Sequence, residues 1–140
     1  MICKTFPADH TEFYEEFEVW RKESLNKKLP EEGVYILYAG TPIDRFLKKD
    51  PKGILYIGKG IILPYHNRIG KFINAINDTE KGSHKGGDRF YLIQKVKDRF
   101  PISNMKVEIQ LTDNSKEQEK DLLDEYYSTY GDTPPLNRII

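Results

Sequence analysis

Four polar side chains in this sequence have the types that phosphodiester chemistry requires. Tyr35 and Tyr56 lie in two short apolar segments bounded by glycines, GVYILYAG at 33–40 and GILYIGKG at 53–60. Arg68 follows the second segment, and Glu119 lies in a charged segment further on. Tyrosine can donate or accept a proton, arginine can bind phosphate through two hydrogen bonds, and a carboxylate can hold a divalent cation. Gathered in one cleft, these groups would suit phosphodiester hydrolysis.

The hydrophobic pattern predicts an α+β domain that would hold these side chains around one small sheet. Apolar runs and alternation predict strands at 34–39, 54–57 and 106–111. Apolar residues at helical spacing predict helices at 9–27, 67–77, 88–100 and 115–130. We therefore expect a mostly antiparallel three-stranded sheet flanked by helices, because strands joined by a short link tend to pair. Residues 1–32 would form an N-terminal helical extension, and residues 33–140 the main domain.

Composition excludes several classes of protein. The chain of 140 residues is 38% hydrophobic and 31% charged, which suits one soluble domain better than a disordered or fibrous chain. It has no apolar run long enough to span a membrane and no signal-peptide core, so we expect no membrane partner. Its one cysteine, Cys3, and its three dispersed histidines offer neither an internal disulfide nor a zinc site. We expect a reducing, cytoplasmic location.

The order of these motifs resembles that of the GIY-YIG nuclease superfamily. The match covers residues 33–137 and rests on five elements that occur in the family's order and spacing. They are GVY at 33–35, YIG at 56–58, Asn67-Arg68 at the start of a helix, EKDLLDEY at 119–126, and PLN at 135–137. The two tripeptides alone would be weak evidence, whereas the five elements together are specific.

This resemblance implies a metal-dependent endonuclease that hydrolyses phosphodiester bonds in DNA, leaving a 5′-phosphate and a free 3′-hydroxyl. By resemblance, Arg68 would bind the scissile phosphate, and Glu119 would hold one Mg²⁺ or Mn²⁺ ion per active site. Tyr35 and Tyr56 would point into one cleft. Two further residues would support the site without acting chemically: Gly58 and Asn137.

The sequence departs from the family at the position of a proton carrier. Many members have a histidine one turn after the arginine, and Phe72 stands there in this chain. Lys59 and Tyr35 are then the better candidates for the base, although a lysine needs its pKa lowered by burial or nearby cations. His84, in the loop SHKGG, is a third candidate or, alternatively, a contact to the phosphate backbone.

Basic charge is concentrated in the middle of the chain. Residues 45–97 hold twelve Lys or Arg against four Asp or Glu, although the whole chain is neutral. A basic middle can form a positive face for DNA, whereas the same charges can also be an ordinary solvated surface. The residues we expect to contact DNA are Arg45, Lys48, Lys49, Lys52, Lys71, Lys85 and Arg89. A homodimer or larger complex would bring two sites together for cleavage of both strands.

Two other interpretations of the sequence stay open. A module of the same fold could bind nucleic acid or a partner without turnover, although the presence of all four residues of the catalytic types disfavours it. An unrelated small enzyme could use Gly58-Lys59-Gly60 as a phosphate loop, but that motif is too short to match a Walker or dinucleotide loop. Cleavage of DNA in the presence of a divalent cation would separate the nuclease from both.

Overall fold

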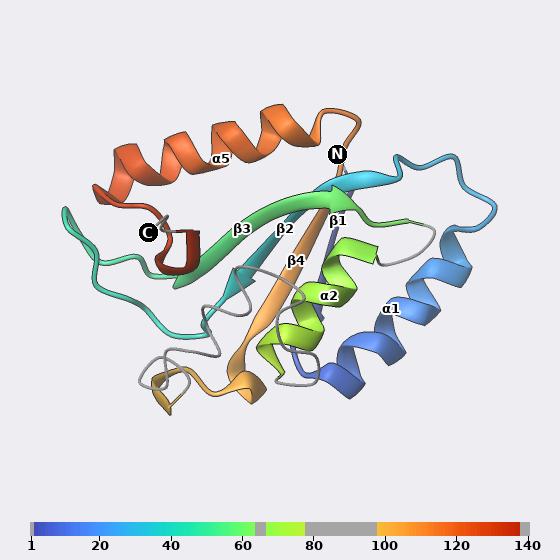
Figure 1. Cartoon of the computed structure of the whole chain (residues 1–140), viewed down its shortest axis with the longest axis horizontal. Helices are drawn as coiled ribbons and strands as arrows, with labels where there is room; N and C mark the ends of the chain where they lie inside the picture. Colours follow the sequence, from blue (N-terminus) through green and yellow to red (C-terminus); the bar gives the residue numbers. More distant parts are fainter. Residues whose placement is uncertain (1, 64–66, 78–97, 138–140) are drawn as a thin grey trace.

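The computed structural model describes residues 2–63, 67–77 and 98–137. Labelled as in Figure 1, its elements are β1 (Ile2–Pro7), α1 (His10–Ser24), β2 (Glu32–Tyr38), β3 (Ile54–Ile61), α2 (Asn67–Ile76), the 3₁₀ turn η1 (Ile102–Asn104), β4 (Lys106–Leu111), α5 (Ser115–Tyr130) and the 3₁₀ turn η2 (Pro135–Asn137). The predicted strand at 106–111 and helix at 115–130 are confirmed at both ends. Most of the helix predicted at 88–100 lies outside the described residues.

Four strands form one antiparallel sheet in the order β1-β4-β2-β3. The α+β class is therefore confirmed, whereas the predicted count of three strands is wrong because β1 was not foreseen. Phe6 is the one buried residue of β1. The sequence of this strand therefore does not show the alternation of apolar and polar residues by which strands are recognised. Pairing with β4 along its whole length makes this segment a strand.

The N-terminal segment shares the core of the main domain. Phe6 of β1 lies with its ring centroid 5.5 to 5.9 Å from the rings of Phe13, Phe17 and Trp20, which form the apolar stripe of α1. Asp9 caps this helix by accepting a hydrogen bond from the backbone N–H three residues further on. Residues 2–24 therefore form a strand and a helix that pack into the main core.

Helices cover both faces of the sheet. Figure 1 shows α1 and α2 on one side of the strands and α5 on the other. The main core, which includes Tyr35 and Leu37, lies on the side of α1 and α2. A smaller cluster of Val34, Ile36 and Ile57 packs against the α5 side. Alternate residues of β2 thus enter different cores, as the two-residue period of a strand requires.

The ends of α5 are fixed by two local features. Ser115 does not cap the helix, because its hydroxyl donates to the Glu32 carboxylate, and Asn114 holds the cap position instead. Since Glu32 pairs with Ile61, this contact brings the first turn of α5 to the end of β3. At its other end the helix ends at Gly131, whose φ of 75° is the left-handed conformation that glycine adopts readily.

In the part of the chain that the structure describes, no helix is both long enough and apolar enough to cross a membrane.

Candidate active site at the edge strand β3

Two tyrosines and a phenylalanine form a packed trio of rings beside the edge strand β3. Tyr35 on β2 is fully buried, and Tyr56 on β3 is partly buried. The ring of Phe72, from α2, lies 5.3 Å from that of Tyr35 and 5.0 Å from that of Tyr56, measured between centroids. The tyrosine rings themselves are 6.1 Å apart. Such distances are typical of favourable aromatic contacts, so the trio holds both phenols in fixed positions.

Gly58 makes room for these two rings. It stands opposite Tyr35 in the β2–β3 register. A Cβ atom at this position would lie 2.7 Å from Cζ of Tyr35 and 2.7 Å from Cε2 of Tyr56, which is closer than carbon atoms can pack. Any side chain at position 58 would therefore displace both phenols, so the glycine in the YIG tripeptide is required by space rather than by backbone conformation.

Gly60 makes room for Arg68 in the same way. A Cβ atom at position 60 would lie 2.6 Å from Cβ of Arg68 and 2.7 Å from its Cγ. The stem of the arginine therefore lies directly on the backbone of β3. Arg68 is in the first turn of α2, and its guanidinium lies close enough to the Tyr35 hydroxyl to lower the pKa of that phenol. The two glycines that flank Lys59 thus place an arginine and two tyrosines on one side of the strand.

Glu119 acts electrostatically on the same group of residues from α5, the helix on the opposite face of the sheet. It lies near the start of α5, is partly buried, and interacts electrostatically with Lys59 and Arg68. Partial burial raises the pKa of Glu119 above its ordinary value, while the positive charges of Lys59 and Arg68 act against that rise. A carboxylate from α5, an arginine from α2 and a tyrosine from β2 are therefore near enough to influence one another's charge.

The buried tyrosine keeps its proton at neutral pH. Burial raises the pKa of Tyr35 well above its ordinary value, and the negative charge that Tyr56 would carry adds to the effect. The hydrogen bond and positive charge of Arg68 lower the pKa, but they do not cancel the burial. Tyr35 is therefore a neutral phenol that can donate a hydrogen bond, and it is poorly suited to act as a base.

Asn137 braces the outer edge of β3. Its side-chain oxygen accepts a hydrogen bond from the backbone N–H of Ile57 at 2.8 Å, and its side-chain nitrogen donates to the Ile57 carbonyl at 2.8 Å. The amide thus replaces the neighbouring strand that an edge strand lacks. Because Ile57 lies between Tyr56 and Gly58, this clamp fixes the backbone that carries the site.

The predicted DNA contacts fall into three groups. Lys48, Lys49 and Lys52 are exposed in the segment between β2 and β3, and Lys71 is exposed on α2. Arg45 lies in the same inter-strand segment, but its side chain is largely buried and forms an ion pair, so it is not placed to meet a phosphate. The remaining predicted residues lie outside the described part of the chain: His84, Lys85 and Arg89.

Sequence reasoning did not foresee how Gly60 and Phe72 support the site. Gly60 admits the stem of Arg68, and Phe72 completes the ring trio in the place where a histidine was expected. The glycine at position 60 in GKG was the available signal for the arginine contact, since glycine within a strand often marks a close approach. The position of Phe72 depends on how α2 packs on the sheet, which the sequence does not specify.

The residues present fit a hard divalent cation. Within the described residues no three His, Cys, Asp or Glu side chains converge, so a closed metal cage is absent from that part of the chain. Mg²⁺, however, is commonly held by one or two carboxylates, with water and substrate phosphate as its other ligands. The single carboxylate of Glu119, next to an arginine suited to phosphate, matches that chemistry.

Comparisons with protein-family models, with curated proteins and with solved structures gave no significant match.

Proposed function

We propose that this protein is a GIY-YIG-type endonuclease that hydrolyses phosphodiester bonds in DNA with the help of one Mg²⁺ or Mn²⁺ ion. The observation that carries the proposal is that Tyr35, Arg68 and Glu119, from three different elements, interact electrostatically with one another. These residues lie up to 84 positions apart in the sequence, from 35 to 119. Their mutual influence in the fold gives physical support to a resemblance that rests on short motifs.

Each side chain has a distinct task in this proposal. Arg68 binds the scissile phosphate and balances the charge that develops on its oxygens. Glu119, in its ionised form, would hold the cation, which would supply Lewis-acid stabilisation of the phosphate. Tyr35 donates its hydroxyl proton as a hydrogen bond and, through its contact with Arg68, fixes the direction of the guanidinium.

The bond changes follow from hydrolysis that leaves a 5′-phosphate. A water oxygen attacks phosphorus, the bond from phosphorus to the 3′-oxygen breaks, and that oxygen leaves with a proton as the 3′-hydroxyl. The water must lose a proton during attack, and a group near β3 must accept it. Tyr35 is a poor acceptor because burial raises its pKa, so Tyr56 and Lys59 are the described candidates.

The test is cleavage of supercoiled plasmid by the purified protein with Mg²⁺, with Mn²⁺ and with EDTA. We expect nicked and linear products with either metal and none with EDTA, and we expect the ends to be ligatable because they carry 5′-phosphates. DNA binding without any cleavage under all metal conditions would favour a binding module of the same fold. The absence of both binding and cleavage would contradict a role on DNA.

We expect the protein in the cytoplasm. A homodimer would account for linear products formed in a single encounter with the plasmid.

A further inference from the structure

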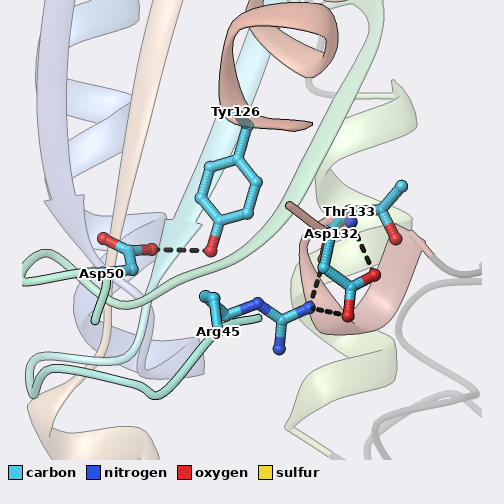
Figure 2. Close-up of polar contacts among 5 residues, drawn as sticks. All are labelled: Arg45, Asp50, Tyr126, Asp132 and Thr133. Atoms are coloured by element: carbon cyan, nitrogen blue, oxygen red, sulfur yellow. Dashed lines mark hydrogen bonds and ion pairs between the residues drawn. The ribbon is translucent and has the colours of Figure 1, made fainter. Parts of the chain in front are cut away.

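The segment that joins β2 to β3, residues 42–52, is held rigidly at its base. We name it the 42–52 arm. Ile43 and Asp50 pair through their backbones at 3.0 and 2.8 Å. The carboxylate of Asp50 is fully buried and accepts hydrogen bonds from the N–H groups of Lys52 and Ile54 and from the Tyr126 hydroxyl, at 2.8 to 3.0 Å. Figure 2 shows the last of these bonds, which ties the arm to α5.

The middle of the arm is fastened to the end of α5. The guanidinium of Arg45 donates to the Thr133 carbonyl and forms an ion pair with Asp132 at 3.0 Å (Figure 2). The backbone N–H of Leu47 donates to the Tyr130 carbonyl at 2.9 Å. Gly131 permits this approach, because a Cβ atom there would lie 2.6 Å from Cγ of Leu47. The arm is thus a preorganised projection rather than a loose loop.

The tip of this arm nevertheless exposes its apolar side chains. Phe46 is 82% exposed, the highest value among the large hydrophobic residues of the described chain, and its neighbour Leu47 is 59% exposed. Because the Phe46 ring is mostly in water, its burial adds very little to the stability of the fold. Such a ring is suited to contact another molecule.

The charge around the tip indicates what that molecule is. Lys48, Lys49 and Lys52 are exposed on the arm, and Lys48 also lies 5.8 Å from the centre of the Tyr130 ring. Asp44 is the one exposed acidic residue of the arm, and it lies beside Lys49 at 3.7 Å. An exposed aromatic ring on a segment that also exposes three lysines is a combination that nucleic-acid surfaces use, with the ring stacking on a base and the cations meeting phosphates.

Phe46 is better suited to an unpaired base than to intact duplex. Stacking a base on an aromatic side chain strengthens binding about five- to a hundred-fold per base. Opening a paired and stacked step costs affinity of the same order or more. A single ring that inserts into paired duplex DNA therefore adds little net affinity. A base that is already unstacked has no such cost, so stacking it on the ring adds its full affinity.

We propose that the 42–52 arm recognises an unpaired base in the DNA substrate by stacking it on Phe46, an inference that rests on the proposed nuclease function. The arm adjoins Tyr130 at the last turn of α5, while Glu119 lies eleven residues earlier on that helix. At the rise of an α-helix this corresponds to about 16 Å, or roughly five base steps of DNA. The preferred substrate is a duplex with an unpaired base about that far from the cleaved bond.

The experiment compares affinities for two labelled 30-base-pair duplexes, one fully paired and one with a three-nucleotide mismatched bubble, measured by fluorescence anisotropy in EDTA. The variants are Phe46→Ala, Phe46→Trp and, as a matched control, Val19→Ala, which removes a 58% exposed apolar side chain from α1. Thermal melting of each variant verifies the fold. Salt dependence is measured as well, because Phe46 carries no charge and its removal should leave the slope unchanged.

We expect the parent to bind the bubble more tightly than the paired duplex. Phe46→Ala should lose about ten-fold on the bubble and less than two-fold on the paired duplex, Phe46→Trp should retain the preference, and Val19→Ala should match the parent on both. Equal losses on the two duplexes, or no loss on the bubble, would overturn the inference while leaving the nuclease proposal intact. A parent protein that binds neither duplex would contradict both proposals.

Discussion

Two regions of the β2–β3 pair position their key side chains by different means. Within the strands, the phenols of Tyr35 and Tyr56 are held by ring packing and by the space that Gly58 leaves. Between the strands, the 42–52 arm is held by hydrogen bonds around the buried Asp50, and Phe46 at its tip stays in water. The first arrangement fixes groups that we propose to act in cleavage, and the second fixes a ring that we propose to contact DNA.

This difference predicts how substitutions should act. Groups fixed by packing are coupled to the stability of the fold, so changes there should affect folding and cleavage together. Groups at the arm tip contribute little to the fold, so changes there should alter binding alone. Four predictions test this contrast, from the largest effect to the smallest.

Arg68→Ala should reduce the single-turnover cleavage rate by about 10²–10³-fold, because the transition state loses one charged donor. Arg68→Lys should recover little of the rate, since lysine cannot make the planar two-pronged contact with phosphate. Lys22→Ala, on the acidic helix α1, is the control and should cleave like the parent. Full activity of the lysine variant would rule out the two-pronged geometry.

Gly58→Ala should destabilise the protein by about 1–3 kcal/mol, because its methyl group would overlap the rings of both Tyr35 and Tyr56. The displaced phenols should also lower cleavage strongly at temperatures where the variant is folded. Chemical denaturation measures the first effect. Lys59→Ala, on the adjacent exposed position, serves as the stability control, and equal unfolding free energies for the two variants would mean that the rings are not packed as described.

Changing Lys48 and Lys49 together to Gln should weaken DNA binding and reduce its dependence on salt. The slope of log affinity against log salt should fall by about one unit for each phosphate that a lysine no longer neutralises. The matched pair Lys27 and Lys28, in the connection after α1, should have little effect when changed in the same way. A larger weakening for the control pair would mean that DNA approaches a different face.

The acid limb of cleavage should move to higher pH in Lys59→Gln. Glu119 must be ionised to hold a cation, and burial raises its pKa, so activity falls as pH decreases through that value. Lys59 acts to lower this pKa, and its removal should therefore raise the midpoint. Lys116→Gln is the control on α5. A midpoint that stays fixed or moves to lower pH would contradict the proximity of Lys59 and Glu119.

Much of the fold could be predicted from the sequence because an element with one buried face and one exposed face has regularly spaced apolar residues. The stripe of Phe13, Phe17 and Trp20 and the alternation of β4 are examples, and both elements were recognised. β1 was missed because it is an edge strand with one buried residue, so its structure comes from pairing with β4 rather than from its own pattern.

The residue types of the candidate site could be predicted from the sequence, but the contacts that hold those residues in place could not. Motif order indicated Tyr35, Arg68 and Glu119, whose chemical roles stay predictions. That Gly60 admits the arginine stem depends on a close approach of α2 to β3 that no local pattern encodes. Arg45 counted as a free cation in the sequence, yet Asp132, 87 positions further on, pairs with it in the fold.

The most direct test of the proposed nuclease separates binding from cutting at Glu119. Glu119→Ala and Glu117→Ala each remove one carboxylate from the start of α5, but Glu117 is exposed. DNA affinity in EDTA and the single-turnover cleavage rate in Mg²⁺ are measured for both variants and the parent. We predict that Glu119→Ala binds DNA like the parent and loses cleavage by orders of magnitude, while Glu117→Ala does both like the parent. Parent-like cleavage by Glu119→Ala would contradict the account.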